Sequence, residues 1–171
     1  MKKLSLKEIL LPALALCLIC FITAGAMAVV RHFTRAPIEK NQLAEASDAR
    51  EAIFPGAALE EHENYCAAYR DGTLAGYLME TQAQGYGGPI QLAVGIDPDG
   101  RVLHVQVLAA DSETPGLGQK IKEAGFLSQF ADKQSLDGID CIAGATISSK
   151  AVADAVDHAL EIYKSMGGDA G

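Results

Sequence analysis

The longest uncharged stretch of the chain, from Ile9 to Val30, limits the choice of folds more than any other feature. It contains 22 residues without an acidic or basic side chain. As an α-helix, which rises 1.5 Å per residue, it would be about 33 Å long, enough to cross the ~30 Å hydrocarbon layer of a membrane. The stretch therefore predicts a transmembrane helix over residues 9–30, preceded by a short N-terminal segment, residues 1–8.

A cleaved signal peptide is the alternative interpretation of the same stretch. Three lysines within the first seven residues form a basic leader, and Ala26-Met27-Ala28 has the small residues of a cleavage site. The apolar run is longer than the 7–15 residues of a signal-peptide core, which favours an uncleaved anchor.

Basic residues flank the predicted span on both sides. Three lysines and the amino terminus precede it, whereas Arg31 and Arg35 follow it. Because cytoplasmic flanks carry the excess of Lys and Arg, this asymmetry predicts a cytoplasmic N-terminus. The span would contact membrane lipid in the inner (cytoplasmic) membrane, and residues 31–171 would lie on its extracytoplasmic side.

The composition argues against several classes of function. A formal net charge of -8, without a cluster of Lys and Arg, excludes nucleic acid as a partner, because binding that polyanion requires concentrated positive charge. The pair Cys17 and Cys20 resembles a dithiol or metal motif, but both lie in the apolar run, which favours lipid-facing or helix-facing thiols. A disulfide between Cys66 and Cys141 remains an open alternative.

Beyond the span, residues 37–54 have an apolar residue at most turns of a helix, and Pro55-Gly56 would end that helix. We expect a connecting helix and linker over residues 31–60 and one domain over residues 61–171. The domain begins with strand-like runs separated by turn residues at Asp71-Gly72 and Pro98-Asp99-Gly100.

The strand-like runs predict an antiparallel meander of about four strands. They cover residues 65–69, 74–81, 89–96 and 102–110. In the last run, strict alternation would place Leu103, Val105 and Val107 on one face and Val102, His104 and Gln106 on the other. His104 has no acidic or Cys partner in the pattern and is expected to be an ordinary surface or core residue. With the helices that follow, the fold class is α+β.

Two helices are expected after the sheet. Pro115, Gly116 and Gly118 predict a tight loop, and residues 119–130 have helical spacing interrupted at Gly125. The loop would bring backbone N–H groups and the side chain of Leu117 to a fixed position. A plain strand-to-helix turn fits the same residues. The last helix would begin at a cap provided by Ser148 or Ser149 and stop at Gly167-Gly168.

The segment Ile142–Lys150, IAGATISSK, places Thr146 just ahead of that last helix. Free amides and the positive end of the helix dipole attract phosphate to such a position. The small residues Ala143, Gly144 and Ala145 would let a ligand approach the backbone, and Thr146 supplies a nucleophilic oxygen. A close-packed turn with a Thr or Ser cap is the alternative.

Asp140-Cys141-Ile142-Ala143-Gly144-Ala145-Thr146 resembles the flavin-attachment motif Asp-x-x-Ser/Thr-Gly-Ala-Thr of the FMN-binding domain family. That family includes the G subunit of the Rnf complex and the C subunit of the sodium-pumping NADH:quinone reductase. The stretches GYGGPIQLAVGID, ETPGLGQKI and FLSQF, and the N-terminus with a single span, are also similar to the Rnf G subunit. Ala143 departs from the motif, which usually has a hydroxyl residue there.

The resemblance implies an antiparallel sheet with packed helices that carries FMN. A flavin transferase would move FMN from FAD onto Thr146 and leave a phosphoester. Around the phosphate we expect Gly144, Ala145 and Ser148. Near the isoalloxazine ring we expect Thr114, Leu117 and Gly118, with Glu113 at a polar edge or positioning the loop. Asp140 would serve recognition by the transferase or cap the turn.

The function implied by the resemblance is electron transfer in an ion-translocating ferredoxin:NAD oxidoreductase complex, with other membrane subunits as partners. The chain would be a redox relay and would not catalyse alone, which agrees with the absence of an acid-base or nucleophile-His pattern from the sequence. Three alternatives stay open: the FMN subunit of a sodium-pumping NADH:quinone reductase, a separate extracytoplasmic flavoprotein, and an anchored anion-binding module without redox function.

Overall fold

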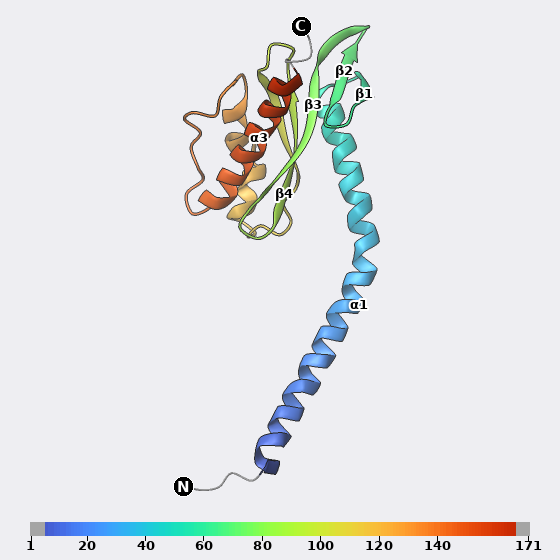
Figure 1. Cartoon of the computed structure of the whole chain (residues 1–171), viewed down its shortest axis with the longest axis vertical. Coiled ribbons are helices and arrows are strands. Elements are labelled where there is room, and N and C mark those ends of the chain that lie inside the picture. Colours follow the sequence, from blue (N-terminus) through green and yellow to red (C-terminus); the bar gives the residue numbers. More distant parts are fainter. Residues whose placement is uncertain (1–5, 167–171) are drawn as a thin grey trace. The chain divides into compact units, whose positions relative to one another are not determined.

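The computed structural model describes the backbone of residues 6–166 and the side chains of residues 10–33 and 45–166. Internal contacts divide the chain into two compact units, Met1–Asn41 and Gln42–Gly171. We expected a linker up to residue 60, but the contacts group residues 42–60 with the domain. Helix α1, Leu6–Ile53, includes residues of both units (Figure 1).

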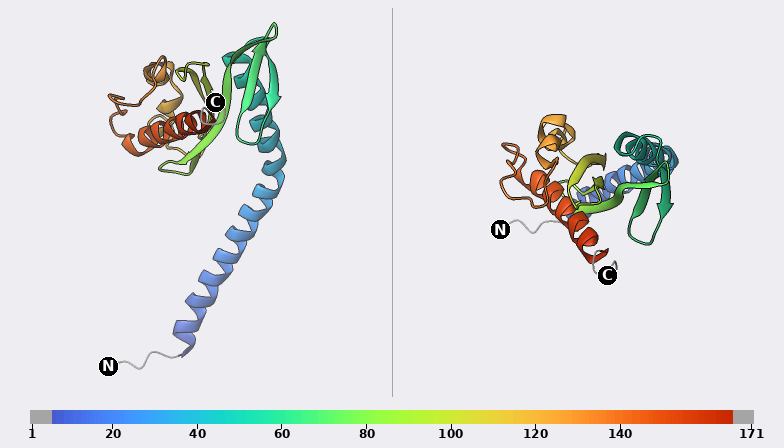
Figure 2. Two further views of the ribbon diagram at one scale, coloured as in Figure 1. Left: turned by 45° about the horizontal axis from the view of Figure 1, so that its top comes forward. Right: turned by 90° about the horizontal axis from the view of Figure 1, so that it is seen from above.

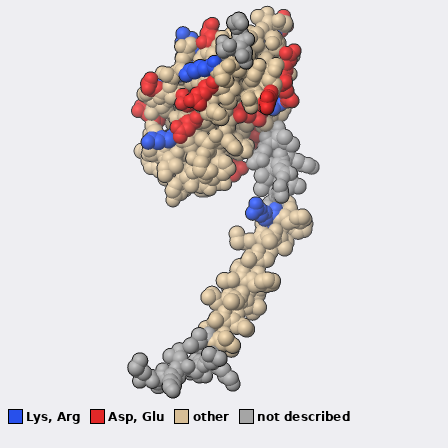
Figure 3. All heavy atoms as spheres, in the orientation of Figure 1, with Lys and Arg blue, Asp and Glu red and all other residues tan. Residues whose placement is uncertain are grey.

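The N-terminal part of α1 contains one stretch, Leu10–Phe33, that is long and apolar enough to cross a membrane. None of its side chains is buried within the chain. It carries no charged residue before Arg31 (Figure 3). This helix fits the predicted membrane anchor. The structure joins the predicted span and the predicted connecting helix into one continuous helix, which ends directly before Phe54 and Pro55, as expected.

Five strands form one antiparallel meander in the order β1-β2-β3-β4-β5. They are β1 (Ala58–Glu61), β2 (Cys66–Arg70), β3 (Thr73–Gln84), β4 (Pro89–Ile96) and β5 (Val102–Ala109). The predicted hairpin turn is confirmed, because Asp71 and Gly72 both have positive φ angles, 52° and 78°. The prediction of about four strands missed β1, whose four residues are mostly exposed and show no apolar alternation.

Two bulges in β5 correct the predicted alternation of its side chains. Gly95 pairs with His104 and Ile96 with Val102, so Leu103 is an extra residue and is 40% exposed. A bulge puts two residues opposite one and shifts the side-chain alternation. Val102 therefore joins Val105 and Val107 in the core instead of facing away from them. A second register shift follows Gln91 and places Leu108 in the cluster on the other face. His104 is exposed.

Helices cover both faces of the sheet (Figure 2). One face packs against α3 (Thr146–Met166) and short segments, which enclose the larger core around Met79, Leu92 and Phe130. The other face is covered by the end of α1, which buries Ala49 and Ile53 together with Phe54. One polar group in the larger core is satisfied: the Thr81 hydroxyl donates a hydrogen bond to the carbonyl of Ala155, 2.9 Å away.

Two predictions about helices were wrong. Residues 119–130 form three short pieces instead of one helix: η1 (Gly118–Lys122), α2 (Ala124–Leu127) and η2 (Ser128–Phe130). Helix α3 begins at Thr146, so Ser148 and Ser149 lie inside its first turn and do not cap it. Both hydroxyls are buried and bond elsewhere, which explains why they are not at the cap. Gly167-Gly168 lies outside the described residues.

Candidate functional site

A tight turn carries Thr146 to the start of α3. The N–H of Ala145 donates to the carbonyl of Ile142 at 2.9 Å, which closes a turn with Gly144 at its third position. Gly144 has φ +80°, a conformation that L side chains rarely adopt, and a Cβ added there would lie 3.3 Å from Leu117 Cδ1. Ala143 is exposed at the second position. Glycine at position 144 is therefore required by the geometry of the turn and by its contact with Leu117.

The first turn of α3 presents free donors beside this turn. In the described part of the chain, no group accepts a hydrogen bond from the backbone N–H of Thr146, Ile147 or Ser148. The first amides of any helix lack intrahelical partners and carry the positive end of its dipole. The Thr146 side chain is exposed, and its hydroxyl makes no hydrogen bond with any described residue. The site thus places a free hydroxyl beside three free N–H donors.

Ser149 fastens the turn to the helix. Its Oγ donates to the carbonyl of Ala145 at 2.9 Å and accepts from the N–H of Ile142 at 3.0 Å. Ser149 is 1% exposed, and its bond to Ala145 is buried, whereas the bond from Ile142 is partly buried. They fix the position of the turn that precedes Thr146.

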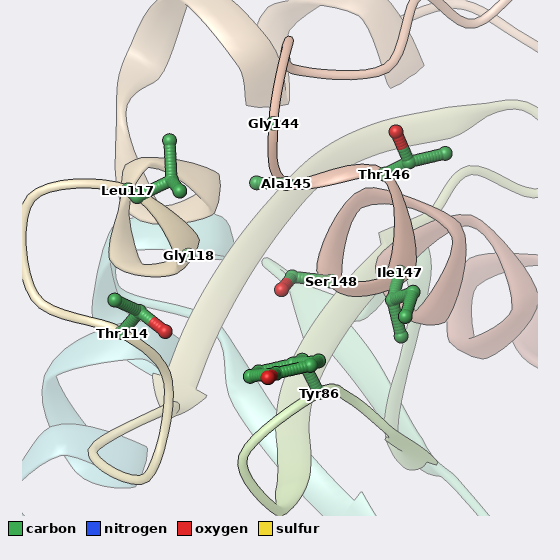
Figure 4. A pocket seen from close by; sticks show the side chains of 9 residues that line it. All are labelled: Tyr86, Thr114, Leu117, Gly118, Gly144, Ala145, Thr146, Ile147 and Ser148. Atoms are coloured by element: carbon green, nitrogen blue, oxygen red, sulfur yellow. The ribbon is translucent and has the colours of Figure 1, made fainter.

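The loop after β5 provides a second wall. The N–H groups of Leu117 and Gln119 both donate to the carbonyl of Thr114 at 3.2 Å, and Gly116 has φ +74°. This compact turn holds the side chain of Leu117, 39% exposed, toward the space in front of α3 (Figure 4). The predicted tight loop is confirmed, and it presents Leu117 as expected.

Glu113 joins three segments behind these walls. Its side chain is 2% exposed; Oε1 accepts from the N–H of Gly87 at 2.9 Å, and Oε2 accepts from the Ser148 hydroxyl at 2.5 Å. Glycines surround the carboxylate closely, since a Cβ on Gly85 would clash with Oε1 and one on Gly118 would lie 2.8 Å from Oε2. Glu113 thus positions the turn between β3 and β4 against the start of α3.

These segments enclose a cavity of about 480 Å³. Figure 4 shows Thr114 and Leu117 on one side, the first turn of α3 on the other, and Tyr86 between them. The cavity is lined by nine residues: Tyr86, Thr114, Leu117, Gly118, Gly144, Ala145, Thr146, Ile147 and Ser148. Its size falls within the range of about 300–1,000 Å³ that is typical of small-molecule sites.

The structure brings together seven of the eight residues that we predicted to bind the cofactor. Glu113 is the exception, because it lies behind the wall and does not line the cavity. Two lining residues were missed, Tyr86 and Ile147, which are 71% and 55% exposed. The signals were present in the sequence: Tyr86 stands between two glycines, in the segment between two predicted strands, and Ile147 directly follows Thr146.

Other chemistry-bearing groups lie outside the cavity. Asp140 is exposed, and its carboxylate makes no hydrogen bond with a described residue, so it does not cap the turn. All four cysteines are free. Burial raises the pKa of the Cys66 thiol. Among residues described by the structure, no group of three or more His, Cys, Asp or Glu side chains could hold a metal ion.

Two family models match the chain. The FMN-binding domain matches residues 85–161, which include every residue of the cavity, and the RnfG N-terminal region matches residues 1–53. The chain also resembles solved structures of the C subunit of a Na⁺-translocating NADH-quinone reductase. NqrC from Shewanella oneidensis has a TM-score of 0.50 at 22% identity, covering 56% of this chain and 54% of the other. The protein from Parabacteroides distasonis has a TM-score of 0.51 at 23% identity, covering 68% and 79%. These likenesses support the fold.

Curated relatives match along most of the chain. The G subunit of the proton-translocating ferredoxin:NAD(+) oxidoreductase complex of Clostridium ljungdahlii is 29% identical, with 83% of this chain and 84% of the relative covered. The G subunit of the ion-translocating oxidoreductase complex of Methanosarcina acetivorans is 30% identical, with 95% and 98% covered. Its counterpart in Pseudomonas aeruginosa is 31% identical, with 92% and 89% covered. At this identity and coverage, the chain belongs to the family of G subunits of ion-translocating oxidoreductase complexes.

Proposed function

We propose that this chain is the membrane-anchored FMN subunit of an ion-translocating ferredoxin:NAD oxidoreductase complex. The observation that carries the proposal is the match to the FMN-binding domain over the segments that build the cavity at the start of α3. Two relatives that are named as the G subunit of a ferredoxin:NAD(+) oxidoreductase complex, matched over 84% and 90% of their length, support the assignment to this type of complex. The function is that of a redox relay between other membrane subunits.

The chemistry of the cavity fits FMN. The free N–H groups of Thr146, Ile147 and Ser148 suit a phosphate, because a helix N-terminus binds anions through its amides and its dipole. The exposed apolar side chains of Tyr86 and Leu117 suit an aromatic ring system. When bound, FMN supplies the electron-accepting and electron-donating chemistry that amino-acid side chains lack.

We assign roles to the lining residues on this basis. Gly144, Ala145 and the backbone N–H of Ser148 would surround the phosphate, while the Ser148 hydroxyl is already engaged with Glu113. A second set would hold the ring and keep water from it: Tyr86, Thr114, Leu117, Gly118 and Ile147. Glu113 positions the walls. No step requires these residues to act as acid or base, because an electron relay needs position and potential.

Thr146 is the proposed point of covalent attachment. Its exposed hydroxyl is free to react, and a phosphate bonded to it would lie beside the N–H groups of its own helix turn. The hydroxyl oxygen forms an ester bond to the flavin-side phosphorus of FAD. The pyrophosphate P–O bond breaks, AMP leaves, and the hydroxyl proton passes to the departing AMP. A flavin transferase would catalyse this step.

The helix Leu10–Phe33 would anchor the domain to the membrane, and the basic residues before the span favour an extracytoplasmic domain. Attachment through Thr146 has a physical benefit on that side. A dissociated FMN would be diluted into the surrounding medium, whereas an ester bond keeps it on the protein.

The test uses the full-length chain produced together with a flavin transferase. Thr146→Val removes the hydroxyl and keeps the shape of the side chain, whereas Thr146→Ser keeps the hydroxyl. Fluorescence in a denaturing gel is expected for the wild type and for Thr146→Ser and not for Thr146→Val. Mass spectrometry of the wild type is expected to show one added FMN, less one water, on the peptide that contains Thr146.

The outcomes separate three parts of the proposal. Flavin that co-purifies with the wild type but is released on denaturation would keep the FMN site and refute the ester. A full-strength fluorescent band from Thr146→Val would refute Thr146 as the acceptor. A colourless wild type would refute the flavoprotein assignment.

A further inference from the structure

The segment that carries the attachment motif lies in a long irregular loop. Residues 131–145 form no helix or strand between η2 and α3. Loops of this length within a compact domain are uncommon and are usually functional. A partner that binds one conformation of a flexible loop must order that loop, which costs conformational entropy. Hydrogen bonds that already hold the loop in the free protein lower this cost of binding.

The beginning of this loop is bonded to the sheet. Asp132 N–H donates to the carbonyl of Val102 at 2.8 Å, and Val102 N–H donates to that of Lys133 at 2.9 Å. The side-chain amide of Gln134 donates to the carbonyl of Asp99 at 2.9 Å. These bonds hold the part of the loop that is farthest in sequence from Thr146.

The middle of the loop is held by the side chain of one residue in η2, Gln129. Its Oε1 accepts from the N–H of Asp140 at 2.9 Å, and its Nε2 donates to the carbonyl of Asp140 at 3.3 Å. A side-chain amide has both a donor and an acceptor, so one Gln satisfies both backbone groups of one residue. Gln129 is half-buried, whereas the Asp140 side chain points to solvent without a bond to any described residue.

We propose that Gln129 is a positioning residue for covalent flavin attachment, acting through the backbone of Asp140. The proposal rests on the attachment to Thr146 proposed above. With Gln129 at Asp140 and Ser149 at Ile142, the motif is bonded at two points before the acceptor. The Asp140 carboxylate and the Thr146 hydroxyl are both exposed and can contact the modifying enzyme. Because the segment between them is held at these two points, the enzyme meets both groups in one arrangement. The carbonyl of Asp137, next to Gly138, accepts a hydrogen bond from Lys133 Nζ at 3.2 Å, but that bond lies before Gly138, so the two bonds to Gln129 are what hold the backbone of Asp140 itself.

The test measures the initial rate of FMN incorporation into the full-length protein, with a flavin transferase and FAD, by in-gel fluorescence. Gln129→Met keeps the length of the side chain and removes both bonds to Asp140. We expect it to slow incorporation about tenfold, the factor that corresponds to ordering one more backbone residue on binding. Gln129→Glu keeps an acceptor for the Asp140 N–H and is expected to lose less.

The matched control is Gln134→Met. Gln134 lies in the same loop and also donates a side-chain amide hydrogen bond to a backbone carbonyl, but its bond is remote from the motif. We expect its rate to equal that of the wild type. A second readout separates positioning from general damage: after complete incorporation, Gln129→Met is expected to show the same flavin spectrum and reduction potential as the wild type, because Gln129 does not line the cavity.

Equal rates for wild type and Gln129→Met would overturn the proposal, and so would an equal loss in Gln129→Met and Gln134→Met. If Gln129→Met does not fold, Gln129→Glu against Gln134→Glu decides in the same way. A wild type that takes up no FMN on Thr146 would instead refute the proposed attachment, so the two failures are distinguishable.

Discussion

Ser148 donates its hydroxyl hydrogen bond to Glu113 across 35 positions of the sequence, with Oγ and Oε2 separated by 2.5 Å. Both residues are 2% exposed. The same carboxylate accepts from Gly87 at 2.9 Å. Glu113 therefore fixes the turn that bears Tyr86 relative to the helix that bears Thr146. The cavity has its shape because one buried carboxylate connects its walls.

The first prediction concerns this carboxylate. Glu113→Ala leaves the buried Ser148 hydroxyl without its acceptor, which costs about 1–3 kcal/mol of unfolding free energy. The Gly87 N–H also loses its acceptor, but Gly87 is exposed, so water can replace part of that bond. Glu113→Gln retains an acceptor for Gly87 and places an amide donor beside the Ser148 oxygen, so the loss should be smaller. Denaturant unfolding of the domain measures both, and Glu123→Ala, an exposed carboxylate in the following loop, is the control.

In the FMN-loaded protein, Glu113→Ala should also alter the flavin fluorescence, because Tyr86 is no longer held by its loop. Glu113→Gln should keep the wild-type spectrum. The assigned role of Glu113 is wrong if Glu113→Ala matches the wild type in both stability and spectrum.

A second prediction uses two glycines of the same loop. Gly144 and Gly138 have nearly equal φ angles, +80° and +78°, so an Ala at either position is strained by about 1–3 kcal/mol. Only Gly144 has a neighbour close to the added Cβ, Leu117 Cδ1 at 3.3 Å, whereas Gly138 has no atom within 4 Å. Both variants should lose stability, but only Gly144→Ala should also slow FMN incorporation. Equal incorporation by the two variants would contradict the role of the turn.

Much of the site could be predicted because its signals are local in sequence. The small residues before Thr146, the Pro-Gly loop around Leu117 and the alternation of the central strands each require only neighbouring residues. That these motifs would lie in one cavity was predicted from the resemblance to a family. The meander agrees with this prediction, because its short connections keep neighbouring segments together.

The parts that sequence analysis missed depend on distant partners. The bulge at Leu103 is set by the pairing of β5 with β4, which no local pattern specifies. Ser148 was interpreted as a cap because capping is the common role of Ser near a helix start, but its hydroxyl bonds to Glu113 from another segment. The helical spacing of residues 119–130 could not show that the chain breaks into short pieces, because tertiary packing overrides propensity in such short stretches.

A third prediction tests the side of the membrane. Cys141 is exposed and Cys66 is half-buried. A chain that retains only Cys141 should react in intact cells with a membrane-impermeant maleimide if the domain is extracytoplasmic. Labelling that appears only after the membrane is opened would place the domain in the cytoplasm. A chain that retains only Cys66 is the control for accessibility.

The pH dependence of Cys66 labelling follows from burial, which raises the pKa of that thiol above its ordinary value of 9.0. The thiolate is the reacting form, and a raised pKa leaves less of it at any pH below the pKa. Cys66 should therefore react slowly at pH 7–8, and its rate should still be rising at pH 9 in a stopped-flow or gel-based assay. A fast reaction at pH 7 would show that the thiol is more accessible than the structure indicates.

The final prediction concerns where a stable soluble domain can begin. The end of α1 buries Ala49 and Ile53, together with Phe54, on the outer face of the sheet. The fit is close, since a Cβ on Gly95 would clash with Ile53 Cγ2. A chain that begins at Gln42 keeps this cover and should be monomeric and cooperative in unfolding. One that begins at Ala58 exposes the apolar outer face and should aggregate.

Point variants distinguish the loss of buried side-chain contacts from the effect of shortening the chain. Phe54→Ala in the chain that begins at Gln42 should cost about 3–5 kcal/mol of unfolding free energy, because it removes a large buried side chain and leaves a cavity. Arg50→Ala removes two partly exposed ion pairs, with Glu80 at 2.9 Å and with Glu61 at 3.5 Å, and should cost about 1 kcal/mol, less than the loss of Phe54. If the chain from Ala58 proves as soluble and as stable as the chain from Gln42, then residues 42–57 are a linker after all, and the outer face of the sheet needs another cover.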